Sequence, residues 1–110
     1  MPNYVDVTTI CLYLVEFEWD PGKNAANIAK HGIDFEDALR IFEGPVLEGT
    51  DERRHYEEVR IIAFGVVEDR ELAVVYTMRG RHRRIISARR AHRPERKAYR
   101  EAHPKEPTSR

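Results

Sequence analysis

Residues 59–90 constrain the fold of this chain more than any other stretch, because three apolar runs follow one another there with only short polar breaks between them. The runs are rich in valine and isoleucine, which favour strands, and the breaks at Asp69-Arg70 and Gly80-Arg81 fit two-residue hairpin turns. The stretch therefore predicts three consecutive antiparallel strands. Apolar and polar residues also alternate from Leu12 to Trp19, which predicts a further strand, and Pro45 to Thr50 is compatible with a short one.

Three helices are predicted around these strands. Asp20-Pro21 begins the first, since the aspartate side chain caps free backbone N–H groups and proline fits the first turn, and Gly32 ends it. Asp34 begins the second, which carries an apolar stripe at helical spacing: Phe35, Ala38, Leu39 and Phe42. A third helix follows the last strand. The sequence thus predicts an α+β fold, in which an antiparallel sheet of about four strands has two helices packed on one face and a C-terminal helix.

The length of 110 residues suits a single domain. Within it we expect an N-terminal extension over residues 1–12, a folded core over residues 13–103 and a flexible tail over residues 104–110. The first ten residues lack the basic start of a secretion signal, and no apolar run approaches the roughly 20 residues that span a bilayer. The single cysteine, Cys11, permits no intrachain disulfide. These features predict a cytoplasmic protein that has no membrane partner.

Positive and negative charges are unevenly divided along the chain. Residues 1–78 contain 7 Lys/Arg and 16 Asp/Glu, a net charge of −9, whereas residues 79–110 contain 12 and 3, a net charge of +9. Such a division indicates either a polyanion-binding surface or a basic segment that pairs with acidic surface of its own chain. The two helices that meet at Gly32 do not fit a DNA-reading helix-turn-helix, since the second, DFEDALRIFE, is acidic and would repel phosphate.

The two tight turns also predict which strand residues share a face of the sheet. Arg60 would lie opposite Arg79, and one face would end in a basic cluster: Arg60, Arg79, His82 and Arg84. The other face is more apolar, would carry Ser87 and Arg89 at its end, and would pack against the helices. Like charges opposite each other in a sheet are destabilising, so the cluster needs a counter-anion. That anion is either a bound phosphate or a carboxylate of the same chain: Asp51, Glu57 or Glu58.

Four segments, in this order, resemble the BrnT toxins of bacterial type II toxin–antitoxin systems: FEWDPGKNAANIAKHGIDFEDA, RRHYEEVRIIAFG, VVYTMRG and RIISARRAHRPERKAY. The resemblance covers roughly residues 16–99. It implies a RelE-like fold, with a small antiparallel sheet and helices on one side, and a ribonuclease that cleaves RNA and inhibits translation. It also implies a BrnA-like antitoxin as partner, whose DNA-binding module would bring the complex to operator DNA.

Cleavage of RNA without a metal ion requires a group that takes the proton of the attacking 2′-OH, and cations that stabilise the charged phosphate. Arginine suits the second task because its planar guanidinium donates two parallel hydrogen bonds. The candidate catalytic residues are Arg60, Arg79, Arg84, His31 and His82. The position of His31 at the end of the first helix is explained equally well by a packing or capping role.

Six further residues are candidates for RNA binding: Lys23, Asn27, Lys30, Tyr76, Arg89 and Arg90. The first three recur at helical spacing, so they form either a basic rim for RNA or simply the solvated side of their helix. Arg89 and Arg90 point to opposite faces of a strand, so one is expected to contact RNA and the other to pair with Glu95.

The histidines and the cysteine form no C-x-x-C or H-x-x-x-H motif, and no carboxylate pair suggests a divalent site, so we expect no metal and no other cofactor. Two alternatives to a ribonuclease stay open. One is a module that binds nucleic acid without cutting it, and the other is a protein-interaction domain whose basic half docks an acidic partner.

Overall fold

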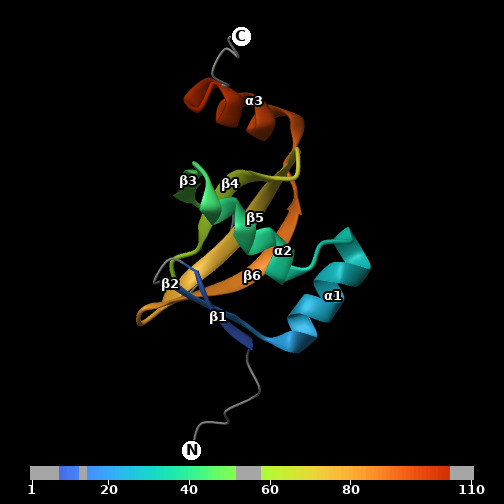
Figure 1. Cartoon of the computed structure of the whole chain (residues 1–110), viewed down its shortest axis with the longest axis vertical. Coiled ribbons are helices and arrows are strands. Elements are labelled where there is room, and N and C mark those ends of the chain that lie inside the picture. Colours follow the sequence, from blue (N-terminus) through green and yellow to red (C-terminus); the bar gives the residue numbers. More distant parts are fainter. Residues whose placement is uncertain (1–7, 13–14, 52–57, 105–110) are drawn as a thin grey trace, which may run out of the picture.

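The computed structural model describes residues 8–12, 15–51 and 58–104 of the chain. These residues form a six-stranded sheet with the strand order β1-β2-β6-β5-β4-β3 (Figure 1). In chain order the elements are β1 (Thr8–Leu12), β2 (Val15–Trp19), α1 (Pro21–His31), α2 (Phe35–Ala38), the 3-10 helix η1 (Leu39–Glu43), β3 (Leu47–Thr50), β4 (Ile61–Val67), β5 (Arg70–Arg79), β6 (His82–Arg90) and α3 (Arg93–Ala102). The α+β class is confirmed, with more strands than the four expected. None of the helices in these ranges is long and apolar enough to cross a membrane.

The strand expected from Leu12 to Trp19 is β2, which begins at Val15, and an additional antiparallel strand, β1, precedes it. β1 pairs with β2 from Thr8 opposite Trp19 to Leu12 opposite Val15, so part of the expected N-terminal extension belongs to the sheet. Because β1 has no alternation of apolar and polar residues, its sequence did not predict it. Residues 1–7 and 13–14 lie outside the described residues, as does the expected tail beyond Pro104.

The starts of α1 and α2 follow the predicted capping residues. The Asp20 carboxylate accepts a hydrogen bond from the backbone N–H of Lys23, and the Asp34 carboxylate accepts one from the backbone N–H of Glu36. Gly32 adopts the left-handed conformation, with φ 72°, that closes α1. Both predicted helix starts and the predicted end of the first helix are therefore confirmed.

The second helix does not stay α-helical over its predicted length, because it tightens into η1 after Ala38. At η1 the helix meets β4, where a Cβ atom on Gly65 would stand only 2.6 Å from the Cβ of Ile41. Glycine therefore lets the helix contact the backbone of the sheet directly. The predicted apolar stripe is buried at Phe35, Ala38 and Leu39.

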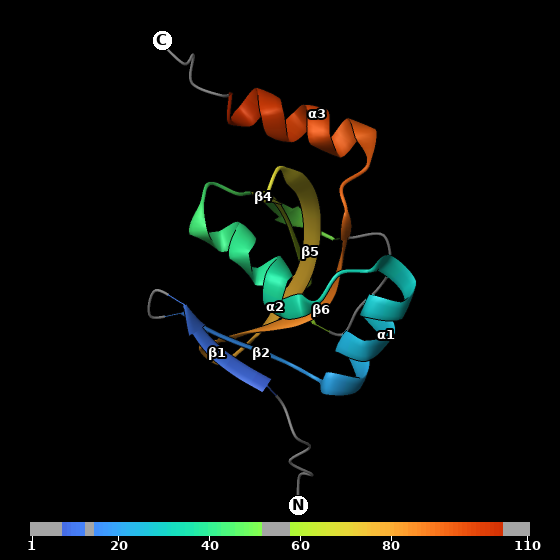
Figure 2. The ribbon, with the colours of Figure 1, turned by 45° about the vertical axis from the view of Figure 1, so that its right-hand side comes forward.

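One face of the sheet packs against α2 and η1, with α1 beside β6 (Figure 2). The strand residues buried in this core are Phe17, Trp19, Ala63, Val67, Leu72, Val74, Tyr76, Ile85 and Ala88. On the three long strands this is the face that the sequence assigned to the helices, so that prediction is confirmed. We call the opposite face the outer face; at the end where β5 turns into β6 it carries Thr77, Arg79, His82 and Arg84.

The turn between β4 and β5 comes one residue earlier than predicted, since Glu68 and Asp69 form it. Both residues have positive φ, 51° and 67°, which a type I′ turn requires, although neither is glycine. Extending the register by one residue places Arg60 opposite Thr77 rather than Arg79. The predicted direct Arg60–Arg79 pair is therefore wrong, but both arginines stay on the outer face, because a shift of two positions preserves the alternation.

The predicted turn between β5 and β6, at Gly80-Arg81, is confirmed. Further along, a β-bulge shifts the register, because β6 contributes one extra residue, Ile86. The expected positions of Ser87 and Arg89 on the helix-covered face are therefore wrong. Beyond the bulge it is Ala88 that is buried in the core, and its two neighbours point to the outer face.

β2 pairs with β6 in parallel, so the sheet is mixed rather than wholly antiparallel as expected. Parallel neighbours need a long crossover, and here the helices α1, α2 and η1 and three strands intervene in the chain. The pairing is short, from Glu16 opposite His82 to Glu18 opposite Arg84. It brings two glutamates to the outer face, beside basic residues of β6.

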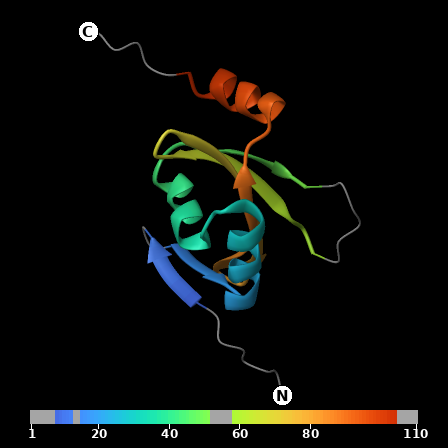
Figure 3. The same ribbon diagram turned by 90° about the vertical axis from the view of Figure 1, so that its right-hand side faces the viewer.

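α3 lies at one end of the sheet, away from α1 (Figure 3). The Glu95 carboxylate accepts a hydrogen bond from the backbone N–H of His92 and two from the Arg89 guanidinium, at 2.8 and 3.0 Å. The Tyr99 hydroxyl donates to the carbonyl of Pro45 at 2.8 Å. α3 is thus fixed both to β6 and to the segment before β3. Of the two arginines that could have paired with Glu95, Arg89 is the one that does so.

Acid is expected to weaken these α3 contacts through Glu95. The hydrogen bonds from Arg89 hold the pKa of Glu95 at about 2, against an ordinary value of 4.5; burial acts in the opposite direction, and the His92 backbone N–H adds to the lowering. A lowered carboxylate pKa stabilises the fold above pH 4.5, and this stability is lost as the pH falls toward 2.

We therefore expect Glu95→Gln to be less stable than the parent chain by about 1–2 kcal/mol at pH 7, allowing for solvent around the pair. Near pH 2 the difference between the two proteins should be much smaller. Urea unfolding at neutral and acidic pH measures this difference, and a value that stays constant with pH would contradict the stabilising role of the Glu95 carboxylate.

Candidate functional site

Two rows of side chains cross the outer face where β5 turns into β6. The first row is Arg60, Thr77, Arg84 and Glu18, and the second is Arg79, His82 and Glu16. Arg79 and His82 are direct cross-strand partners, and their side chains are 53% and 35% exposed. Four of the five predicted catalytic residues therefore share one end of one face.

Arg79, His82 and Arg84 each lie beside a carboxylate among the described residues. Arg79 pairs with Glu58 at 3.4 Å, His82 Nε2 contacts the Glu16 carboxylate, and Arg84 donates to Glu18 at 2.7 Å. Pairing within the chain was one of the two alternatives that the sequence left open, and for Arg79 the expected Glu58 is the partner.

The glutamates of β2 were not expected as partners, because the sequence does not reveal the parallel pairing that brings them there. Of the other expected counter-anions, Asp51 is buried and its backbone N–H donates to the carbonyl of Arg60. Glu57 lies outside the described residues.

The three pairs differ in how far solvent reaches them. The Arg84 and Glu18 side chains are only 20% and 14% exposed, so this ion pair joins β2 to β6 while largely shielded from solvent. The Arg79–Glu58 pair is longer and more exposed, and such surface pairs contribute at most about 1 kcal/mol. A phosphate could therefore replace Glu58 at Arg79 with little loss of stability. Arg84, in contrast, is bonded to Glu18 and holds β2 against β6.

His31 lies apart from this cluster. It ends α1, and α1 contacts β6 through Asn27, whose side chain bonds to Ala88. Ala88 is six residues along β6 from His82, a separation of roughly 20 Å at the usual rise of a strand. His31, one helical turn beyond Asn27, does not belong to the same site as His82 in this structure.

Asn27 is a structural residue, which corrects its expected place on an exposed basic rim. Its side chain is buried, with 7% of the residue exposed. It donates to the Ala88 carbonyl at 2.8 Å and accepts from the Ala88 N–H at 3.1 Å, as a neighbouring strand would. It also donates to the Ile33 carbonyl at 2.9 Å. Asn27 thus closes the edge of β6 beyond the point where β2 ends.

Of the other candidates for RNA binding, some are exposed to solvent, and the rest are held in an ion pair or buried. Lys23, Lys30 and Arg90 are exposed. Arg89 is held in its pair with Glu95. Tyr76 is buried on the helix-covered face, with only 2% of the residue exposed, so its ring is not presented to a nucleotide.

Arg83, which the sequence did not single out, lies between His82 and Arg84 but points to the helix-covered face. Its guanidinium carbon stands 5.7, 4.8 and 5.2 Å from the ring centres of Phe17, Phe42 and Tyr76. Rings at these distances attract a cation through their negatively charged faces. The only sequence signal was the odd position of this arginine within a run whose neighbours on that face are apolar.

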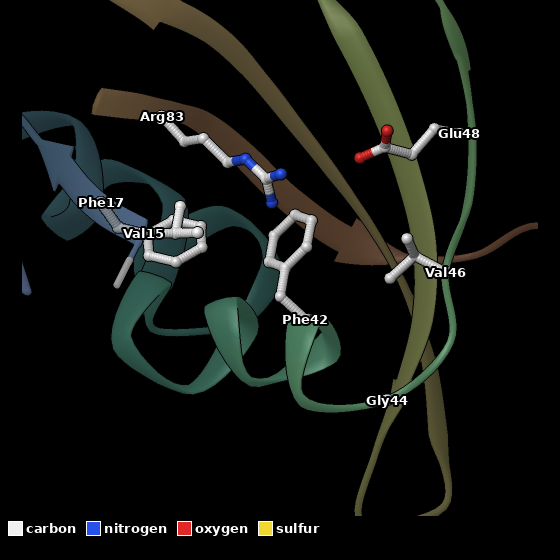
Figure 4. A pocket seen from close by; sticks show the side chains of 7 residues that line it. All are labelled: Val15, Phe17, Phe42, Gly44, Val46, Glu48 and Arg83. Atoms are coloured by element: carbon white, nitrogen blue, oxygen red, sulfur yellow. The ribbon is translucent and has the colours of Figure 1, made fainter. Parts of the chain in front are cut away.

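Beside Arg83 the surface is hollowed over a volume of about 270 Å³ (Figure 4). The close-up shows the Arg83 guanidinium and the Glu48 carboxylate on opposite sides of this hollow, with Phe42 between them. The Tyr76 hydroxyl donates to Glu48 at 2.7 Å. Burial, and secondarily this hydrogen bond, raise the pKa of Tyr76 well above its usual range, while Arg83 acts in the opposite direction. Tyr76 therefore stays protonated and holds Glu48 in place.

A protein-family model, described as the ribonuclease toxin BrnT of a type II toxin–antitoxin system, matches residues 19–95, which are 77 of the 110 residues. The chain belongs to the BrnT family. No curated protein matches the sequence at a significant level.

The range matched by the BrnT model contains the basic residues of the outer face but begins after Glu16 and Glu18. The two carboxylates that pair with His82 and Arg84 thus come from a segment that precedes the matched range. In the parts of this BrnT chain that the structure describes, no group of three or more His, Cys, Asp or Glu side chains is positioned to hold a metal ion.

Proposed function

We propose that this BrnT chain is an endoribonuclease that needs no metal ion, and that it cleaves RNA at the end of the outer face where β5 turns into β6. The observation that carries the proposal is the cross-strand pairing of Arg79 with His82, both exposed and each beside a carboxylate. A cation and an acid–base group side by side are what phosphate-ester cleavage requires.

In this mechanism the phosphate replaces Glu58 at Arg79, because a guanidinium donates two parallel hydrogen bonds to phosphate oxygens. His82 takes the proton of the 2′-OH, and Glu16 orients the imidazole ring. The 2′-oxygen bonds to phosphorus, the bond to the 5′-oxygen breaks, and that oxygen leaves with a proton from water. The resulting hydroxide takes the proton held by His82, so the imidazole returns to its starting state. The products are a 2′,3′-cyclic phosphate and a free 5′-hydroxyl.

Arg84 and Arg60 support this centre from the adjacent row. Arg84 fixes β2, and with it Glu16, through its bond to Glu18. Arg60 adds positive charge on the other side of Thr77, which favours the extra negative charge of the transition state. The exposed cations Lys23, Lys30 and Arg90 add sequence-independent attraction for the RNA backbone.

The type II toxin–antitoxin family implies a protein antitoxin and an RNA target. We propose that the antitoxin is BrnA-like and carries a DNA-binding module, so that operator DNA is bound only through it. We further propose a RelE-like arrangement of the fold, action in the cytoplasm and inhibition of translation as the consequence of cleavage. The exposed basic end of the outer face is the surface that such an antitoxin would need to cover.

Purified protein is expected to cleave single-stranded RNA in the presence of EDTA and to leave 2′,3′-cyclic phosphate ends, which mass spectrometry of the fragments detects. Binding should weaken steeply as salt rises from about 50 to about 200 mM, because the phosphate backbone provides most of the attraction. Binding without cleavage would indicate a non-catalytic module instead. Cleavage only after a divalent ion is added would exclude a metal-independent mechanism.

A further inference from the structure

The hollow beside Arg83 has no part in the cleavage mechanism, yet it holds an arginine whose hydrogen-bonding groups are available. Within residues 8–12, 15–51 and 58–104, no carboxylate lies within ion-pair distance of Arg83. The three aromatic rings attract its charge but do not satisfy its five N–H donors as a carboxylate would. Its guanidinium is thus held in one place with donors facing the hollow (Figure 4).

On the other side of the hollow, Glu48 offers the complementary acceptors. The Tyr76 hydroxyl donates to one of its oxygens, which fixes the carboxylate without exhausting its lone pairs. Val15, Gly44 and Val46 add apolar surface to the lining of the hollow. A planar ligand that has acceptors on one edge, donors on the next and apolar faces would match all three features.

We propose that this hollow binds a guanine base of single-stranded RNA. Guanine presents O6 and N7 to an arginine fork, the commonest specific contact between arginine and a base. Its N1–H and N2–H₂ groups would donate to the Glu48 carboxylate, and single-stranded RNA leaves these edges free. That the ligand is RNA rests on the proposed function, and the hollow adds base selectivity to it.

The other three bases match the hollow less well. Adenine keeps the N7 acceptor for Arg83, but it turns its N6 donor toward the guanidinium and its N1 acceptor toward Glu48, so it retains one of the four contacts. Cytosine has the same mismatch at N4 and N3. Uracil retains one acceptor, O4, and one donor, N3–H, so it keeps half of the contacts. The expected order of affinity is guanine, then uracil, then adenine and cytosine.

The hollow and the proposed cleavage site lie on opposite faces of the same hairpin. Arg83 follows His82 directly in β6, so their Cα atoms are about 3.8 Å apart while their side chains point to opposite faces. The exposed Arg81 lies at the tip between these faces. An RNA strand crossing this basic tip would place its phosphate at Arg79 and, within a few nucleotides, a base in the hollow.

The test measures equilibrium binding of GMP, UMP, AMP and CMP to the purified chain by titration calorimetry, with cleavage of RNA assayed in parallel. GMP is expected to bind at least about tenfold more tightly than AMP or CMP, with UMP between them. Glu48→Gln and Arg83→Leu should each weaken GMP binding about tenfold or more and remove the preference. Arg40→Leu is the matched control, since Arg40 is exposed and pairs with Glu68 at the other end of the sheet.

Equal binding of all four nucleotides, or no binding of GMP at millimolar concentration, overturns the inference. So does an Arg83→Leu variant that binds GMP normally but binds the antitoxin poorly, because the hollow would then be a protein-docking site. Thermal unfolding of each variant shows that the fold is retained, and Glu48→Gln preserves size if Arg83→Leu unfolds. RNA cleavage without a preference for GMP refutes only this inference, whereas a GMP preference without cleavage refutes only the ribonuclease mechanism.

Discussion

Arg79→Ala and His82→Ala variants are each expected to cleave RNA about 100-fold more slowly than the parent chain, or slower still, while staying folded. The first removes the cation that binds the phosphate, and the second removes the group that takes the 2′-OH proton. Both side chains are exposed and their ion pairs contribute little to stability, so thermal unfolding should hardly change. Initial cleavage rates of a defined RNA, together with growth of bacteria expressing each variant, measure the effect.

Two comparisons sharpen this experiment. Arg40→Ala removes an exposed arginine that pairs with Glu68 at 3.4 Å, the same distance as between Arg79 and Glu58, and it should leave cleavage unchanged. His31→Ala tests the histidine that the structure separates from the outer face. If His31→Ala abolishes cleavage while His82→Ala does not, or if both Arg79→Ala and His82→Ala remain fully active, the proposed site is wrong.

Asn27→Ala is expected to lower the free energy of unfolding by about 3–5 kcal/mol, because the substitution leaves three buried backbone groups without partners. These groups are the Ala88 N–H, the Ala88 carbonyl and the Ile33 carbonyl. Leaving a buried polar group unsatisfied costs about 1–3 kcal/mol each. Since a domain of this size is stable by about 5–15 kcal/mol in all, the variant should be close to unfolding at physiological temperature.

Urea unfolding followed by circular dichroism measures this loss. Lys30→Ala is the matched control, because Lys30 is exposed on the same helix and its replacement should change stability by less than about 0.5 kcal/mol. The comparison also separates the two roles considered for Asn27. A variant that is as stable as the parent but binds RNA poorly would restore the RNA-binding role and contradict the structural one.

Helix caps and tight turns, which depend on a few adjacent residues, were largely predicted from the sequence. The Asp20 and Asp34 caps, the left-handed Gly32 and the Gly80-Arg81 turn each depend on a few adjacent residues, and all four are confirmed. The β4–β5 turn was misplaced by one residue because Glu68-Asp69 and Asp69-Arg70 are equally polar. Alternation along the strands still separated the two faces correctly as far as the bulge at Ile86.

Contacts between distant segments could not be predicted in this way. An alternating strand such as β2 does not reveal which strand it will pair with, so neither the parallel pairing with β6 nor the roles of Glu16 and Glu18 were foreseen. The same limit applies to Arg83, whose three aromatic neighbours come from three different elements. Asn27 was assigned to the surface because helical spacing alone cannot distinguish a solvated amide from one that bonds to a strand edge.

The parallel pairing of β2 with β6 has a consequence for the order in which the proposed site is made. Glu18 and Arg84 are bonded across 66 residues of chain, and among the strands of the described residues β6 is synthesised last. Any fragment that ends before residue 82 lacks His82, even where it already contains Glu16 and Arg79. Fragments that end before His82 are therefore expected to lack RNA cleavage, because the proposed site is first complete once synthesis has passed β6.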